Sequence, residues 1–196
     1  KEFETLGFYI SDHPLNQYKS IFNQYNIINY DDFENNPDML SSNIACTVLK
    51  VQEKKTLKGS SYGIVKFSDL SSVFEIFIFS EIFENNRDLL FEGNSLMLTL
   101  IKNYSDENKK QKKINLKKIL SLKDIIDSPL KHIIFKFNSI EKISVLKKFS
   151  QIDGETSIKV HVDQDDELLI LKLREKRKVT NKLLNSLNLV ENVVID

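Results

Sequence analysis

The chain has 196 residues, of which 41% are hydrophobic and 29% charged, and its formal net charge is zero. These proportions are ordinary for a globular protein of one or two domains, and no overall field attracts a polyanion. The single cysteine, Cys46, excludes a disulfide framework and favours a reducing compartment such as the cytoplasm. No apolar run approaches the roughly 20 residues that span a bilayer, so we expect no membrane partner.

Charge is distributed unevenly along the chain. Residues 1–43 carry two basic and seven acidic side chains, residues 44–123 carry fourteen basic and nine acidic, and residues 124–196 carry twelve of each. Only the middle segment is basic, so contacts to a polyanion are expected there.

Residues 1–42 are predicted to form a helical connector. Pro14 suits the first turn of a helix, with Asp12 or His13 as its cap, and apolar side chains recur at helical spacing as far as Tyr25. A second, short helix is predicted around Asp31–Asn35 in an otherwise polar stretch.

Residues 43–125 contain five predicted strands and one helix. The strands are Ile44–Gln52, Ser61–Ser68, Val73–Phe79, Ser95–Lys102 and Lys113–Leu122. Asp69–Ser72 supplies a turn between the second and third strands. The helix follows the third strand, with Ser80 as its N-cap and Gly93 as its C′ residue. Three strands, a helix and two strands is the order of the OB-fold, a five-stranded β-barrel that binds oligonucleotides.

Two lysine-rich loops connect strands of this predicted barrel. An OB-fold closes the corresponding loops around its ligand, and lysine offers a mobile charge to phosphates. The alternative, that both are simply solvated loops, stays open. The candidate nucleic-acid contacts in and beside these loops are Lys54, Lys55, Lys58, Lys109, Lys110 and Lys112.

The hairpin of the second and third strands offers further candidates. Strand alternation places Tyr62 and Lys66 on one face, and Glu75 and Phe77 on the wetter face of the next strand. Tyr62, Lys66 and Phe77 are therefore candidates for a base-stacking platform. Glu75 repels phosphate, however, and Phe77 fits ordinary packing equally well.

Residues 130–196 are predicted to form a second domain with β-α-β-β-α-β order. One helix follows Ser139, the other spans Val179–Leu187, and Asp153-Gly154 is predicted as a turn. The predicted fold class is α+β, in which an OB-fold barrel follows the helical connector and precedes this small domain. The strands of the small domain are His132–Phe137, Ser157–Val162, Glu167–Leu173 and Asn192–Ile195.

The sequence contains no recognisable catalytic or metal-binding pattern. Its three histidines and one cysteine lack zinc-site spacing, and its five glycines include no phosphate-binding loop. The carboxylates of residues 163–167 fail the calcium-loop pattern because Leu168 stands where glycine is needed, and we interpret them as a solvated turn. We expect no catalytic residue, metal or cofactor in this chain.

Several motifs resemble those of one enzyme family. Residues 4–15 read ETLGFYISDHPL, and residues 56–71 contain TLKG followed by IVKFSDLS. Residues 74–93 contain FEIFIF, RDLL and a closing glycine. These segments resemble E-x-L-G-F-Y-L-S-G-H-P-L, T-K-K-G…V-T-L-E-D-L-S and I-E-V-V-V-F…Y-R-D-L-L…G of bacterial DNA polymerase III alpha subunits, the DnaE family. Residues 179–193 are similar to the extreme C-terminus of that family.

The resemblance covers essentially the whole chain, with three departures. Asp12 and Ser72 replace glycines of the family pattern, and Leu57 replaces a lysine. The lost lysine weakens the case for phosphate contacts by the loop between the first and second predicted strands. The lack of an initial Met agrees with a piece of a longer chain.

The resemblance implies a larger DNA-directed DNA polymerase, with this chain as its C-terminal part. The parent would use magnesium at carboxylates upstream of Lys1. The resemblance further implies that the barrel contacts single-stranded template and that the last domain binds the tau subunit of the clamp loader. The sliding clamp and the proofreading exonuclease would be partners through the parent chain.

Two other interpretations stay open. The anticodon-binding OB domain of an aminoacyl-tRNA synthetase would share the barrel, but it needs class II catalytic motifs downstream, which residues 124–196 lack. A protein-docking module would share the barrel and bind no nucleic acid.

Overall fold

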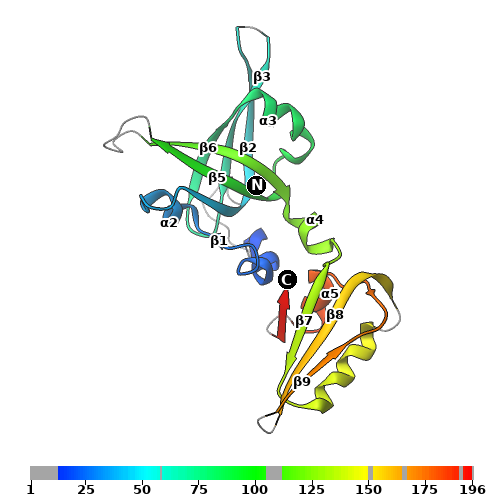
Figure 1. The fold of residues 1–196 in the computed structure, drawn as a ribbon. Coiled ribbons are helices and arrows are strands. Elements are labelled where there is room, and N and C mark those ends of the chain that lie inside the picture. Colours follow the sequence, from blue (N-terminus) through cyan, green and yellow to red (C-terminus); the bar gives the residue numbers. More distant parts are fainter. Residues whose placement is uncertain are drawn as a thin grey trace. The chain divides into compact units, whose positions relative to one another are not determined.

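The computed structural model divides the chain into two compact units, Lys1–Asp124 (unit 1) and Ile125–Asp196 (unit 2). Figure 1 shows the elements of each unit. The structure describes residues 13–57, 59–104, 112–149, 152–164, 167–189 and 192–195. Most of the predicted motif at residues 4–15 lies outside the described residues.

The connector contains two short helices. The 3₁₀ helix η1 spans Pro14–Ile21, and His13 caps it by accepting a hydrogen bond from the Leu15 N–H at 3.1 Å. This helix is shorter than predicted, because the chain turns before Asn26, which has a φ of +48° that asparagine tolerates. Helix α2, Tyr30–Asn35, confirms the second predicted helix.

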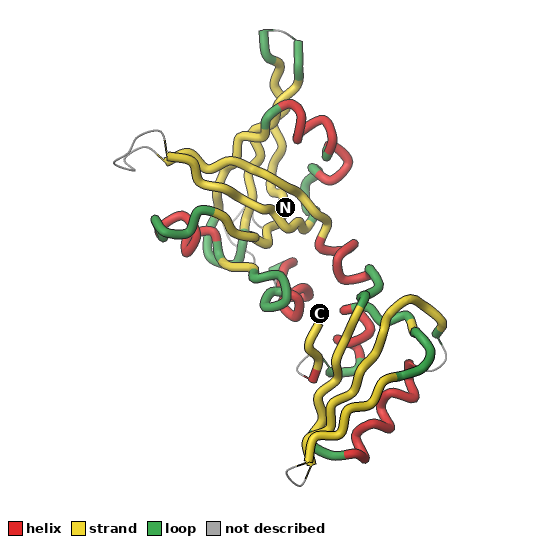
Figure 2. The backbone as a smooth tube through the Cα atoms, in the orientation of Figure 1, coloured by secondary structure: helices red, strands yellow, loops and turns green. Residues whose placement is uncertain are grey.

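One mainly antiparallel sheet dominates unit 1 (Figure 2). All five predicted strands are present, in the spatial order β4-β3-β2-β5-β6, and the unpredicted β1 (Ile27–Ile28) pairs in parallel with β2. Strand β2 is longer than predicted because its first half pairs with β5 and its second half with β3. The five strands are β2 (Ser41–Lys55), β3 (Ser61–Ser68), β4 (Val73–Ile78), β5 (Ser95–Tyr104) and β6 (Lys112–Ser121).

The sheet of unit 1 is not a closed barrel. Within the described residues no hydrogen-bonded pairing joins β4 to β6, although the two strands contact each other. The predicted five-stranded barrel is therefore wrong in its closure. The sheet nevertheless curves around one core, which includes the fully buried Phe67, Phe83 and Leu98. A register shift between Val48 and Lys50 marks a bulge, which bends a strand of this kind.

Two short helices follow β4. These are α3 (Ser80–Asn85) and the 3₁₀ helix η2 (Arg87–Leu89). The predicted Ser80 cap is wrong, because the N-cap position is Phe79 and no side chain caps the helix. The predicted helix end at Gly93 is also wrong, since α3 ends at Asn85, with Asn86 as its C-cap. Gly93 instead adopts a φ of +86° in the turn before β5.

Unit 2 confirms the predicted β-α-β-β-α-β order, and both units together confirm the α+β class. Helix α4 (Leu122–Asp127) precedes β7 (His132–Phe137), and the 3₁₀ helix η3 (Ile140–Phe149) leads to β8 (Asp153–Gln164). The β7–β8 pair is parallel. Strand β9 (Glu167–Lys172), helix α5 (Asn181–Ser186) and β10 (Val193–Ile195) follow, and the sheet order is β10-β7-β8-β9.

The predicted turn at Asp153-Gly154 is wrong. Both residues belong to β8, and Asp153 forms an isolated bridge with Arg177. A Cβ atom at Gly154 would lie 2.5 Å from the backbone of Lys178. Glycine is therefore needed here for a close approach of two chain segments and not for a turn.

Candidate nucleic-acid interface

One face of the β2-β3-β4 segment lies away from the core of unit 1. Directly opposite residues of antiparallel strands point to the same side of a sheet, so the strand pairings arrange the outward side chains in rows. Val65 and Ile76, which lie between the rows, are buried on the other side. We call the outward side chains, together with Phe79 just beyond β4, the outer face of unit 1. Its rows are Lys50–Lys66–Glu75, Gln52–Ile64–Phe77 and Lys54–Tyr62.

Three aromatic rings form a continuous cluster on this face. The rings of Tyr62 and Phe77 are tilted with centroids 4.9 Å apart, and Phe77 meets Phe79 edge to face, also at 4.9 Å. Phe77 is 41% exposed and Phe79 is 45% exposed. Two large apolar rings therefore remain accessible where the predicted stacking platform lies, and an exposed ring offers its π-face to a base.

Cationic side chains surround the aromatic cluster. Lys54 stands opposite Tyr62, and Lys66 stands between Lys50 and Glu75. The Nζ atom of Lys113, from the start of β6, lies 5.1 Å from the centroid of the Phe79 ring. Lys50 and Lys113 were not among the predicted site residues. Only the strand register reveals Lys50, because its lysine neighbour Lys66 is sixteen positions away in the sequence.

Of the remaining predicted contacts, the structure describes the side chain of Lys55 alone, and it does not lie on this face. Lys55 is paired with Ser61, and strand alternation places it on the side opposite to Lys54. Lys58, Lys109 and Lys110 lie outside the described residues, as does the side chain of Lys112. The structure thus brings together Lys54, Tyr62, Lys66 and Phe77 of the nine predicted residues, and the roles of all nine stay predictions.

Tight packing behind the face fixes the position of β3. A Cβ atom at Gly63 would lie 2.5 Å from the Phe83 ring of helix α3. Glycine at this position therefore lets the helix cover the inner side of the hairpin directly behind Tyr62. Phe83 itself is 2% exposed.

An ion pair attaches the end of β2 to the helices. Arg87 donates to both carboxylate oxygens of Glu53, at 2.7 and 2.9 Å, and its guanidinium carbon lies 5.1 Å from the Phe83 ring centroid. The hydrogen bonds from Arg87, followed by one from Ser61, lower the pKa of Glu53 from 4.5 to about 2. This pair holds β2 in place one residue before Lys54.

The hairpin turn is fixed by the carboxylate of Asp69. Its Oδ1 accepts hydrogen bonds from the N–H groups of Ser71 and Ser72, both at 2.7 Å. Its Oδ2 accepts the N–H of Tyr30 at 2.5 Å. The Tyr30 ring also stacks on Phe74, with centroids 3.9 Å apart. One buried carboxylate therefore joins the connector to the hairpin, and Asp69–Ser72 is confirmed as a turn.

The described residues contain no group of three or more His, Cys, Asp or Glu side chains suited to a metal ion. Cys46 is buried, and burial raises the pKa of its thiol. In the part of the chain that the structure describes, no helix is long and apolar enough to cross a membrane.

Sequence comparisons place the chain beside polymerase subunits. DNA polymerase III subunit alpha of Rickettsia felis is 34% identical over 129 residues, 65% of this chain and 10% of the relative. That of Borreliella burgdorferi is 24% identical over 184 residues, 88% of this chain and 16% of the relative. That of Aquifex aeolicus is 28% identical over 108 residues, 55% of this chain and 9% of the relative. No protein-family model matches the chain.

These similarities identify the chain as a relative of part of a bacterial DNA polymerase subunit. These relatives are DNA polymerase III alpha subunits, the family that the sequence motifs resemble. The chain covers at most 16% of the length of these three relatives, so their names describe much longer proteins.

Proposed function

We propose that the chain acts within a bacterial DNA-directed DNA polymerase, where unit 1 binds single-stranded DNA and unit 2 docks the tau subunit of the clamp loader. Residues 43–125 are the OB domain in this proposal, residues 1–42 connect it to the parent chain, and residues 130–196 are the tau-binding domain. The parent performs template-directed synthesis with magnesium in the cytoplasm. It also associates with the sliding clamp and the proofreading exonuclease.

The topology of unit 1 supports the OB assignment. The strand order β4-β3-β2-β5-β6, with α3 between β4 and β5, agrees with an OB-fold whose third and fifth strands are not paired. The outer face lies on β3 and β4, the second and third strands in this scheme. That is the surface on which OB-folds bind oligonucleotides.

The observation that carries the proposal is the exposed Tyr62–Phe77–Phe79 cluster bordered by Lys54, Lys66 and Lys113. Stacking on such rings stabilises single strands with little regard to sequence. Lysines beside them attract the phosphate backbone. Glu75 opposes Lys66 at one end of the face, so we place the path of the strand nearer Lys54 and Lys113.

A salt series on the full chain tests DNA binding. Fluorescence anisotropy of a labelled oligodeoxythymidine should show binding whose logarithmic constant falls linearly as the logarithm of the salt concentration rises. Tyr62→Ala should weaken it, while Lys118→Glu, an exposed charge change on β6, is the control for a general electrostatic effect. Absence of binding at low salt would favour the alternative, a protein-docking module.

A second experiment separates the two units. Joint charge reversal of Lys54, Lys55 and Lys58 should reduce DNA affinity and leave tau binding unchanged. Disruption of the unit 2 core should have the opposite effect, because unit 2 has its own hydrophobic cluster. Equal loss of both activities in either variant would contradict the assignment. A synthetase anticodon module predicts binding of transfer RNA in place of DNA, and the polymerase relatives favour the first proposal.

A further inference from the structure

Strand β9 is an edge of the unit 2 sheet with unusual side chains. Its sequence is ELLILK, it pairs only with β8 among the described strands, and four consecutive apolar residues, Leu168–Leu171, are 61%, 41%, 57% and 37% exposed. Figure 1 shows β9 next to β8. Exposed edge strands in soluble proteins usually carry charges, proline or bulges that prevent pairing with another chain. The central four residues of β9 carry none of these.

The hydrogen-bond pattern shows which backbone groups β9 offers to a further strand. The Leu173 N–H donates to the Ile158 carbonyl at 3.0 Å. Because such residues alternate along an antiparallel ladder, Leu171 and Leu169 also face β8. The N–H and carbonyl groups of Leu168 and Ile170 therefore point away from the sheet.

The sheet face next to this edge is basic. On the core side, β7 and β8 pack against apolar residues of η3 and α5, including Leu146, Phe149 and Leu184. On the opposite side, strand register sets Lys159 beside Lys172, and His161 between Lys136 and Ile170. Asp163, opposite Leu168, is the one carboxylate among these rows. We call this side the outer face of unit 2.

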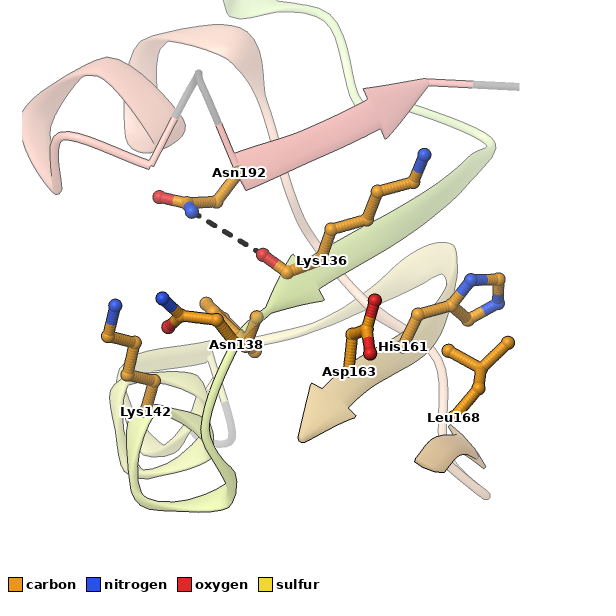
Figure 3. A pocket seen from close by; sticks show the side chains of 8 residues that line it. Lys136, Asn138, Lys142, His161, Asp163, Leu168 and Asn192 are labelled. Atoms are coloured by element: carbon orange, nitrogen blue, oxygen red, sulfur yellow. Dashed lines mark hydrogen bonds between the residues drawn. The ribbon is translucent and has the colours of Figure 1, made fainter. Parts of the chain in front are cut away.

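A pocket of about 530 Å³ lies on this face, where β7 and β8 end. Figure 3 shows Asp163 beside His161, Leu168 on β9 and Lys142 on η3 around it. Lys136 belongs to the same rim, and its carbonyl accepts a 3.4 Å hydrogen bond from the Asn192 amide. The pocket thus adjoins the apolar edge of β9. Its lining contains more cationic than anionic side chains.

These features point to one kind of occupant: we infer that an extended peptide segment of a partner protein, alternating apolar and acidic side chains, adds to β9 as a further strand. Its main chain pairs with the outward groups of Leu168 and Ile170. Its acidic side chains lie on the face of Lys159 and Lys172, and its apolar ones cover Leu169 and Leu171 on the opposite face. A second copy of this chain, added antiparallel, would pair Ile170 with Ile170 and set Leu168 opposite Lys172, so it offers Lys172 no carboxylate on this face.

The inference concerns the chemistry of the surface and holds whether or not the tau subunit is the partner. The probe is a labelled 12-residue peptide in which valine and glutamate alternate. A peptide of the same length in which valine and lysine alternate is the control. Anisotropy with the full chain should show at least about tenfold tighter binding of the acidic peptide. Hydrogen exchange of the Leu168 and Ile170 amides should slow when it binds.

Two pairs of variants localise the effect. Ile170→Pro removes an outward N–H without removing a hydrogen bond to β8, and it should lower the affinity at least tenfold, whereas Ile170→Val should retain it. Joint Lys159→Glu and Lys172→Glu should reverse the preference between the two peptides, whereas Lys148→Glu, exposed on η3, should not. Thermal unfolding shows whether each variant remains folded.

Three results would overturn the inference. They are equal binding of both peptides, unchanged binding by a folded Ile170→Pro variant, and a dimer of the chain alone that Ile170→Pro converts to monomer. The last result would identify a second copy as the occupant. Loss of tau binding in other assays, with peptide binding intact, would count against the proposed function only.

Discussion

The two units present exposed sheet faces of different chemistry. On the outer face of unit 1 the two most exposed apolar side chains are aromatic, Phe77 and Phe79, and lysines lie beside them. In unit 2 they are aliphatic, Leu168 and Ile170, also beside lysines. Flat rings suit nucleobases, whereas branched chains on an edge strand suit another strand. Both surfaces contain lysines. The kind of apolar side chain beside the lysines, aromatic or aliphatic, therefore distinguishes the two surfaces.

The edge strands differ in the same way. Strand β6 at the edge of the unit 1 sheet carries Lys113, Lys117 and Lys118. Strand β9 carries charge only at its two ends, Glu167 and Lys172. Lysine on an edge discourages strand pairing. The lysines of β6 therefore disfavour strand addition at that edge, whereas the central four residues of β9 carry no charge.

The largest expected effect tests whether the two surfaces are independent. Phe135 is 0% exposed and contacts the rings of Phe137 and Phe149. Phe135→Ala should destabilise unit 2 by about 3–5 kcal/mol in a denaturant titration. Binding of the acidic peptide should be lost and DNA binding should change less than about twofold. A similar loss of DNA affinity would show that the two binding surfaces are not independent of each other.

A smaller effect separates stacking from packing at Phe77. Phe77→Leu keeps an apolar side chain on the strand but removes the π-face. The stability of unit 1 should therefore change little, while the free energy of DNA binding becomes less favourable by about 1–3 kcal/mol. Anisotropy and thermal unfolding measure the two quantities. The matched change Ile64→Leu, in the same row, should leave DNA affinity unchanged. If Phe77→Leu binds DNA as tightly as the original chain, Phe77 is a packing residue.

Most strands were predictable because their side chains alternate clearly between core and solvent. Strand β3 has the predicted bounds, Ser61–Ser68, since each second residue from Gly63 to Phe67 is buried. Helix ends were less predictable. The Ser80 cap failed because Phe79 occupies the N-cap position, and the helix stops where the Asn86 amide binds the Ile82 carbonyl at 2.8 Å. Local hydrogen bonds of this kind at helix ends produce no periodic pattern in the sequence.

The candidate site was predictable only in part, for a related reason. Alternation within one strand correctly grouped Tyr62 with Lys66, but Lys50 joins them only through the pairing of β2 with β3. The bulge between Val48 and Lys50 shifts that pairing by one residue. The open edge of β9 was likewise hidden, because its sequence reads as an ordinary strand until its neighbours are known.

Two adjacent lysines give a sharper test of the outer face of unit 1. Lys54 shares a row with Tyr62, and Lys55 lies on the other side of β2. Lys54→Glu should lower DNA affinity by about fivefold, as expected for reversal of one exposed charge near a phosphate, and Lys55→Glu by less than twofold. Anisotropy at two salt concentrations measures both. Equal losses would indicate that both sides of the end of β2, and not this face alone, contact DNA.

The smallest effect concerns the ion pair that holds β2 beside the helices. Because the pKa of Glu53 falls from 4.5 to about 2 on folding, its contribution to stability is present above pH 4.5 and is lost as the pH falls toward 2. The side chains of Glu53 and Arg87 are 38% and 47% exposed, so water and salt screen the pair and its contribution to stability is small.

An NMR titration should place the Glu53 midpoint near 2, and Arg87→Gln should return it toward 4.5. Lys176→Gln, at an exposed ion pair of unit 2, should leave that midpoint unchanged. If Arg87→Gln also lowered DNA affinity as much as Lys54→Glu, the ion pair would be needed to position the outer face, and the separation between binding residues and supporting residues in unit 1 would fail.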